Sequence, residues 1–338
     1  MSRAAIRIGQ FTVVSVLTII IVGAAFESVF SDVYENLSPS WHDARRPVEL
    51  AILGSSQAQH AYNPLKIEEQ TGLYGYNLGS AGQKPDSTYF LLRDFLATEL
   101  PEVIVLDMYW RTLEGELDFS QLARNYEKIS DSDVRRDFFR DGFPLSAKII
   151  HTLPILKYRQ DFYWFLESSL NRLLDRADED ADISDPPAPN TPTEKSTDFR
   201  GYRHTTDTIS ERHISEENKF RNYRFSGFNR RQVEYLRRIV ELARQRNIDI
   251  VVVSAPILPQ SLDLVADYDE IAHRLDTLFR SLDVPYIDLN REPRLTTQLD
   301  ASHFSDENHL NAAGATLVSE WISSLSTLPP DRDGRENR

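Results

Sequence analysis

The stretch Val48-Glu49-Leu50-Ala51-Ile52-Leu53-Gly54-Ser55-Ser56-Gln57 decides the fold, because a short apolar run stops at a glycine and two serines. A run of this length that ends at a turn signal is typical of a buried strand. The same pattern returns at residues 74–78, 103–106, 248–253 and 284–289. Helical periodicity occupies residues 89–100, 229–246, 268–282 and 312–325. Strands that alternate with helices predict a three-layer α/β/α fold around a parallel central sheet.

Composition narrows the class of partner. The chain has 338 residues and a formal net charge of -14. A nucleic-acid-binding protein needs a basic face for the phosphates, so this charge argues against such a protein. The chain has no cysteine, which excludes disulfides and thiolate zinc sites. No motif in the sequence calls for a cofactor.

The N-terminus predicts a membrane anchor. Residues 8–26 are apolar and uncharged, and Arg3 and Arg7 precede them. Such a stretch is long enough to cross most of a bilayer. Positive flanking charges favour a cytoplasmic N-terminus and a periplasmic or extracellular remainder. A cleaved signal peptide is the alternative, since Gly23 and Ala25 suit a cleavage site, and a buried core helix is a third interpretation.

The rest of the chain divides by composition. We expect residues 1–30 to form the cytoplasmic stub and anchor, 31–47 a stalk, 48–330 the α/β domain and 331–338 a disordered tail. An insertion at about 115–228 interrupts the α/β pattern. It begins with a helical, aromatic-rich part, in which we expect residues 162–165 to form core. Its Pro/Thr-rich segment at 186–193 predicts disorder.

Candidate catalytic residues lie beyond the ends of three of the predicted strands. Ser55 and Ser56 follow the first strand, Gly82 follows the second, and Asp306 and His309 follow the last. In open α/β sheets the ligand site lies beyond the carboxyl ends of the strands, so these residues converge. Ser56 would be the nucleophile, His309 its general base, and Asp306 the group that orients His309. The backbone N–H groups of Ser56 and Gly82 are the candidate oxyanion donors.

These motifs resemble the blocks of the SGNH (GDSL-like) hydrolase superfamily. Gly54-Ser55-Ser56 lies where that family has Gly-Asp-Ser, Asn77-Leu78-Gly79-Ser80-Ala81-Gly82 resembles its second block, and Asp306-Glu307-Asn308-His309 matches its final Asp-x-x-His block. The resemblance implies a flavodoxin-like sheet and Ser56 as nucleophile. The Gly-Ser-Ser block together with an N-terminal anchor is similar to membrane-linked members of the family that modify cell-envelope polymers, such as the teichoic-acid D-alanylation protein and the alginate-type O-acetylation proteins. That similarity implies an acylated envelope glycan or small ester as substrate, and a membrane-bound acyltransferase as a candidate partner.

The sequence departs from the family pattern at two positions. Ser55 replaces the aspartate of the first block, and Trp110 falls where the third block has an oxyanion asparagine. The third donor is therefore missing or replaced, and Arg111 is the candidate replacement. Arg111 would otherwise pair with Asp107 or Glu114 on the surface.

Other interpretations remain open at this point. Gly-Ser-Ser after a strand also suits an ordinary turn with a serine helix cap. Asp300, His303, Asp306 and His309 have the residue types of a metal cluster. We expect His60 to lie at the surface or rim. The chain could also be a non-catalytic envelope assembly or glycan-binding component, and the sequence does not distinguish hydrolysis from transfer.

Overall fold

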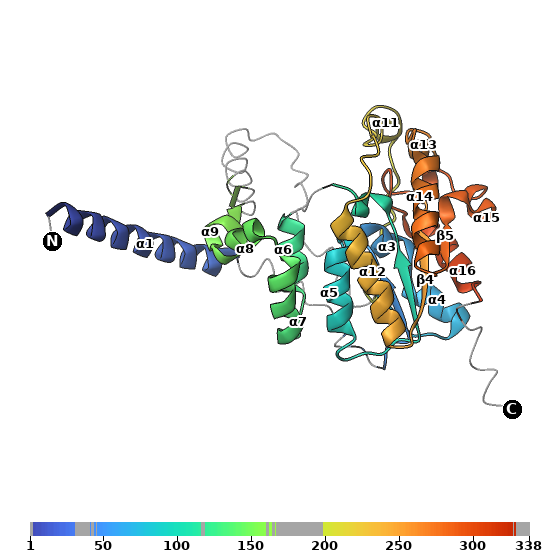
Figure 1. Ribbon diagram of the computed structural model, residues 1–338. Coiled ribbons are helices and arrows are strands. Elements are labelled where there is room, and N and C mark those ends of the chain that lie inside the picture. Colours follow the sequence, from blue (N-terminus) through green and yellow to red (C-terminus); the bar gives the residue numbers. More distant parts are fainter. Residues whose placement is uncertain are drawn as a thin grey trace, which may run out of the picture.

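The central element of the computed structural model is a five-stranded parallel sheet with the strand order β2-β1-β3-β4-β5 (Figure 1). The structure describes residues 3–30, 41, 44, 46–115, 119–159, 162, 163, 166, 199–326 and 328. The strands are β1 (Leu50–Leu53), β2 (Gly75–Asn77), β3 (Val103–Asp107), β4 (Asp249–Ser254) and β5 (Tyr286–Asp288). This is the flavodoxin-like order, and it confirms the predicted α/β fold class.

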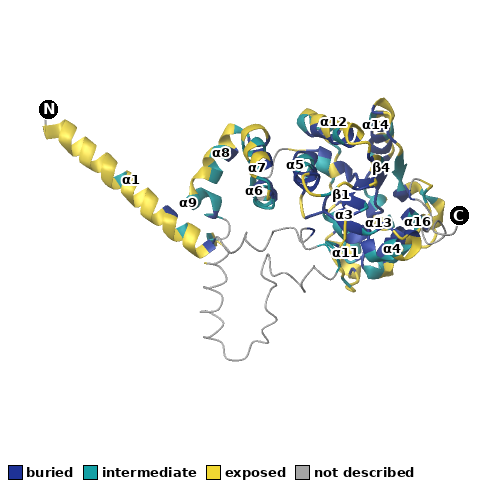
Figure 2. Ribbon diagram, turned by 90° about the horizontal axis from the view of Figure 1, so that it is seen from below, coloured by how far each residue is buried: buried dark blue, intermediate teal, exposed yellow. Residues whose placement is uncertain are grey.

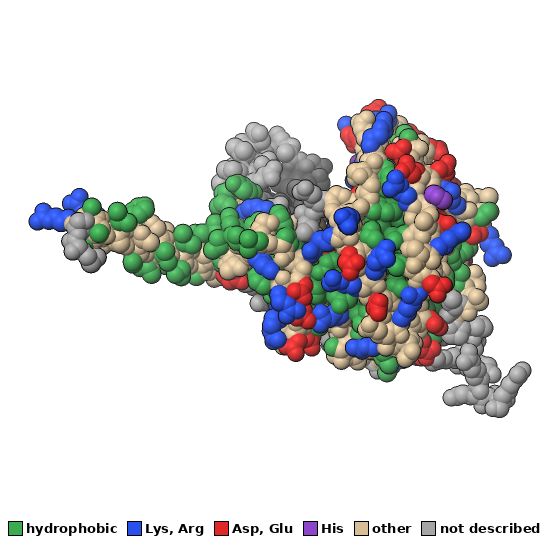
Figure 3. All heavy atoms as spheres, in the orientation of Figure 1, with side chains coloured by type: hydrophobic (Ala, Val, Ile, Leu, Met, Phe, Trp, Pro, Cys, Tyr) green, Lys and Arg blue, Asp and Glu red, His purple; other side chains and the backbone are tan. Residues whose placement is uncertain are grey.

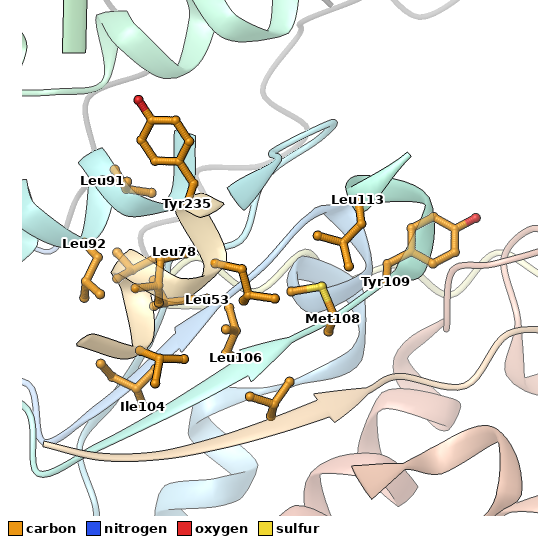
Figure 4. Close-up of a cluster of buried hydrophobic side chains, with 14 of the residues drawn as sticks. Leu53, Leu78, Leu91, Leu92, Ile104, Leu106, Met108, Tyr109, Leu113 and Tyr235 are labelled. Atoms are coloured by element: carbon orange, nitrogen blue, oxygen red, sulfur yellow. The ribbon is translucent and has the colours of Figure 1, made fainter. Parts of the chain in front are cut away.

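Side chains alternate between two hydrophobic cores along each central strand. Ala51 and Leu53 of β1 belong to the larger core, whereas Leu50 and Ile52 belong to the second. Successive side chains of a strand point to opposite faces, so an apolar run fills both cores only in a sheet covered on both sides. Figure 4 shows the larger core, where Leu53 and Leu106 from the sheet meet Leu91 and Tyr235 from two helices.

The helices that form the outer layers follow the strands in the expected places. The larger core is covered by α5 (Pro85–Phe95), α12 (Arg230–Gln245) and α14 (Tyr268–Ser281). The second core is covered by α3 (Ser56–Ala61), α4 (Pro64–Thr71) and α16 (Ala312–Ser323). Short elements connect them: η2 (Trp110–Leu113), α11 (Glu211–Ser215), α13 (Pro259–Leu262), η4 (Leu289–Arg291), α15 (Pro293–Thr296) and η5 (Ala301–His303).

The N-terminal helix α1 (Arg3–Phe30) is long and apolar enough to cross a membrane. Figure 2 shows it exposed along almost its whole length, away from the sheet. Its C-terminal end contacts the first part of the insertion, which contains α6 (Phe119–Glu127), α7 (Ser132–Asp137), η3 (Phe138–Gly142), α8 (Leu145–Thr152) and α9 (Pro154–Lys157). An exposed helix of this kind is not the core helix of the third interpretation.

Several expectations fall outside the described residues, including the disorder at 186–193, the tail at 331–338 and most of the stalk at 31–47. Trp41, within the expected stalk, is buried and packs edge-on against Tyr76 and Phe95. In the aromatic run at 162–165, Phe162 packs against Phe26 of α1 with ring centroids 5.2 Å apart. Tyr163 is exposed, so it is not the core residue that the sequence suggested.

Candidate functional site

The turn after β1 presents one serine and buries the other. Ser55 is buried and caps α3, because its hydroxyl accepts a hydrogen bond from the N–H of Gln57 at 3.3 Å. Ser56, the first residue of α3, is partly exposed. The N–H of a first helical residue has no partner within its own helix. The helix-cap interpretation therefore applies to Ser55 and leaves the Ser56 hydroxyl and N–H available.

A tight turn at the other end of the chain holds Asp306 and His309. One carboxylate oxygen of Asp306, Oδ1, accepts hydrogen bonds from the backbone N–H groups of Asn308 at 2.9 Å and His309 at 3.0 Å. Asn311 then caps α16, accepting from the N–H groups of Ala313 and Gly314. These local bonds follow from Asp and Asn at turn and cap positions.

The fold brings Ser56, His309 and Asp306 into one hydrogen-bonded chain. His309 Nδ1 lies 2.6 Å from Asp306 Oδ2, and His309 Nε2 lies 2.7 Å from Ser56 Oγ. A carboxylate only accepts, so Nδ1 of a neutral His309 carries the proton and Nε2 accepts from Ser56. This is the arrangement that removes a proton from a serine hydroxyl during attack on a carbonyl.

The charge of Asp306 is stabilised in this arrangement. Burial raises the pKa of Asp306, but the hydrogen bond and charge of His309 and the charge of Lys219 outweigh burial and hold the pKa below its usual range. Asp306 is thus ionised at neutral pH, as stabilisation of a protonated His309 requires.

Two side chains that the sequence analysis did not identify brace the turn that carries His309. Gln57 of α3 donates to the backbone carbonyl of Asn308 at 3.1 Å, which ties the serine turn to the turn that carries His309. Lys219, from the insertion, lies 3.5 Å from Asp306 Oδ1 and 3.4 Å from Glu307, and it donates to Asn308 Oδ1. A lone lysine in a polar insertion carries no sequence signal for this role.

The expectation that His60 lies at the surface or rim is wrong. His60 is buried on α3, and its ring centroid lies 4.7 Å from that of His309, with 32° between the ring planes. Burial, and after it the charge of His309, lower the pKa of His60 to about 3. A neutral ring therefore packs on the candidate base. The spacing of Ser56 and His60, one helical turn, was the available signal.

The glycine that contacts the serine turn is Gly79. A Cβ on Gly79 would come within 2.9 Å of the Ser55 carbonyl oxygen and of Ala58, so only glycine permits this close packing. Gly82 is exposed at φ +63°, and a Cβ there would meet Gln121 of α6 at 2.8 Å. The oxyanion role of Gly82 stays a prediction.

Trp110 and Arg111 belong to an aromatic cluster beside the site. Trp110 is buried, and its indole N–H donates to the Tyr223 hydroxyl at 3.0 Å, which in turn donates to Glu114. The Arg111 guanidinium lies 5.5 Å from the centroid of the Tyr223 ring and 5.7 Å from that of Phe220. The Trp110 N–H is thus engaged with Tyr223. Within the described part of the chain, Arg111 makes no ion pair with Asp107 or Glu114.

The four residues of the metal-cluster interpretation form two separate pairs. Asp300 Oδ1 lies 2.9 Å from His303 Nδ1 within the 3-10 turn η5, while Asp306 pairs with His309. Among the residues that the structure describes, no group of three or more His, Asp or Glu side chains is arranged to hold a metal ion.

A strap formed by residues 199–209 crosses the carboxyl edge of the sheet. Four backbone hydrogen bonds hold it. At β2 and α3, the Asn77 N–H donates to the Arg200 carbonyl and the Arg203 N–H donates to the Gln59 carbonyl. At the start of α16 and in the loop before it, the Ala312 N–H donates to the Thr205 carbonyl and the Ile209 N–H donates to the Phe304 carbonyl. The strap belongs to the last part of the insertion, so the insertion returns to the elements that carry the site.

A buried acid lies beneath the serine turn. Asp107, at the end of β3, accepts from the Tyr62 hydroxyl at 2.8 Å and from the Ala255 N–H at 2.9 Å. Burial raises the pKa of Asp107 to about 7. Together with Gly54 and Ser55 it lines a cavity of about 10 Å³, room for about one water.

Comparisons with known proteins give a structural likeness. No family model matches the sequence, and no curated protein matches it. Among solved structures, the chain is similar to a proposed acylhydrolase from Bacteroides fragilis, with 9% sequence identity and a TM-score of 0.37 over 83% of this chain and 89% of that chain. A likeness at this level says nothing about functional residues.

Proposed function

We propose that the protein is a membrane-anchored serine esterase or O-acyltransferase that acts outside the cytoplasm on acyl esters, acetyl esters foremost, of a cell-envelope glycan. The observation that carries the proposal is the chain of hydrogen bonds from Ser56 through His309 to Asp306, at 2.7 Å and 2.6 Å. The apolar helix α1, with Arg3 and Arg7 at its start, supports the anchor and its orientation.

In the proposed reaction, Ser56 Oγ attacks the ester carbonyl while its proton moves to His309 Nε2. The oxyanion of the tetrahedral intermediate is held by the backbone N–H groups of Ser56 and Gly82. Collapse breaks the ester bond, and the leaving alkoxide takes the proton from His309. Water or a sugar hydroxyl then gives its proton to His309 and attacks the acyl-serine. Collapse breaks the bond to Ser56 Oγ, which takes the proton back from His309, and releases the product acid or a new ester.

A serine-reactive fluorophosphonate tests the nucleophile. The wild-type chain should be labelled at Ser56, and Ser56→Ala should abolish both labelling and hydrolysis of a small acetyl ester. Ser55→Ala is the matched control: it should cost about 1 kcal/mol of stability through the lost helix cap and keep the labelling. Full esterase activity in Ser56→Ala would refute the assignment.

A second candidate function is a non-catalytic envelope component, favoured by the engagement of the Trp110 N–H with Tyr223 where the family pattern has an oxyanion donor. It predicts that folded Ser56→Ala and His309→Ala chains keep their biological role. Loss of that role in either variant favours the enzyme.

The ratio of transfer to hydrolysis follows from product analysis with and without an added sugar acceptor.

A further inference from the structure

The helix α8, with its C-cap residue Leu153, carries an apolar face that is largely exposed. Leu145 is 74% exposed, Ile149 51% and Leu153 39%. These residues recur at four-residue spacing, so they form one stripe, named here the α8 shoulder. The opposite side of α8 is packed: Ala147 is buried, and the His151 ring contacts the Tyr126 ring edge-on with centroids 4.8 Å apart.

The α8 shoulder lies beside the end of α1, because α9 follows α8 directly and packs on that helix. A Cβ on Gly23 would lie 3.6 Å from the Pro154 ring, in ordinary van der Waals contact, so Pro154 packs beside α1 at this position. The Tyr158 hydroxyl donates to Glu27 at 3.0 Å, and its ring stacks on Phe30 with centroids 6.0 Å apart. Figure 3 shows the hydrophobic side chains of α1 continuing onto the region of α8 and α9.

The position of this contact along α1 gives its depth relative to a bilayer. The uncharged stretch between Arg7 and Glu27 is about 28 Å long as a helix, close to a hydrocarbon core of about 30 Å. Glu27 then marks the outer boundary of the core. Gly23 lies four residues before Glu27, about 6 Å deeper. Pro154 therefore contacts α1 below that boundary, at the depth of about 5–10 Å that interfacial amphipathic helices reach.

We propose that the α8 shoulder docks on the outer leaflet of the membrane that α1 crosses, so that the domain rests on the lipid surface by two contacts. The occupant is lipid, because the shoulder continues the apolar surface of α1 at the depth of the interface. This proposal rests on the membrane anchorage included in the proposed function, but not on the chemistry of Ser56.

Single-cysteine variants test the docking, since the wild-type chain has no cysteine. Ile149→Cys reports on the shoulder, Val14→Cys on the middle of α1, and Arg237→Cys, on the exposed side of α12, serves as the aqueous control. Each full-length variant is labelled with an environment-sensitive fluorophore and reconstituted into phosphatidylcholine and phosphatidylglycerol vesicles. The vesicles carry nitroxide lipids, spin-labelled either near the headgroup or in mid-chain. Thermal melting confirms that each variant is folded.

We expect mid-chain nitroxides to quench Val14→Cys, and headgroup-proximal nitroxides to quench Ile149→Cys severalfold more than Arg237→Cys. If Ile149→Cys behaves like Arg237→Cys while Val14→Cys is quenched, the shoulder proposal is wrong and the anchor stands. If Val14→Cys is not quenched, the anchor fails and the shoulder proposal fails with it. If the fluorophore on Ile149→Cys is shielded from water, and this shielding disappears when added lipid dilutes the protein in the membrane, a second copy of the chain covers the shoulder. That result also overturns the proposal.

Discussion

Replacement of Asp306 by asparagine separates the proposed catalytic role of its charge from its structural role. Three donors face Oδ1 of Asp306: the N–H groups of Asn308 and His309, at 2.9 Å and 3.0 Å, and the Lys219 ammonium at 3.5 Å. In Asp306→Asn the amide oxygen must occupy this place, because an NH₂ group there would face only donors. The NH₂ group then faces His309 Nδ1.

The consequence for His309 is a wrong tautomer. An NH₂ group donates, so His309 Nδ1 must become the acceptor and Nε2 must carry the proton. His309 then loses the ability to take the proton of Ser56, and no carboxylate stabilises the imidazolium. In a serine-protease triad the same substitution lowers kcat by about 10⁴, which corresponds to about 5 kcal/mol of transition-state stabilisation. We expect a loss of this order.

Stability should change little, since the turn bonds to the oxygen survive and a partly exposed ion pair contributes about 0–1 kcal/mol. The measurements are kcat/KM on a small acetyl ester, the rate of fluorophosphonate labelling and urea unfolding. Asp300→Asn is the matched control, because Asp300 pairs with His303 at the same three-residue spacing, away from Ser56. A loss below about tenfold in Asp306→Asn, or an equal loss in the control, would refute the reasoning, since each tenfold step is about 1.4 kcal/mol.

Three further predictions concern the surroundings of the site. Gly79→Ala should destabilise the protein by about 1–3 kcal/mol and slow fluorophosphonate labelling, because its Cβ would come within 2.9 Å of the backbone of the serine turn; unchanged melting and labelling would contradict this. The pKa of buried Asp107 is raised to about 7. The contribution of Asp107 to the free energy of unfolding should therefore decrease as the pH rises from about 4 to about 7, and Asp107→Asn should remove this decrease in urea unfolding. The pKa of His60 is lowered to about 3. The contribution of His60 to the free energy of unfolding should therefore rise as the pH increases up to about 6.5, and His60→Phe should remove this rise while keeping a ring packed on His309. If either variant keeps the wild-type pH dependence, the corresponding buried group does not titrate as the structure indicates.

The fold was predictable because each central strand is an apolar run that ends at a turn signal. A parallel sheet needs such runs, and Leu50 to Leu53 fill two cores at once. The convergence of Ser56 with His309 was predictable for the same reason, since the carboxyl ends of parallel strands meet at one edge.

The surroundings of the site were less predictable, because their contacts are long-range or made by the backbone. His60 looked like an ordinary helix residue, and its partner, His309, lies at the other end of the chain. The strap at residues 199–209 uses backbone N–H and carbonyl groups, which every residue type except proline offers. Composition therefore assigned this segment to the insertion without showing that it crosses the site.

The insertion connects the two features on which the proposals depend. Its first described part packs on α1 through Pro154 and Tyr158. Its last part lies on the catalytic edge through the strap and through Lys219, which contacts the turn that holds Asp306. If α1 is the proposed membrane anchor, a chain segment that packs on both α1 and the site limits how far the serine can lie from the lipid surface. Under the proposed function, shortening the insertion should thus change which lengths of glycan the serine reaches, while the intrinsic rate on a small soluble ester stays the same. A parallel loss of both activities would instead mean that the insertion acts by holding Lys219 and the strap in place.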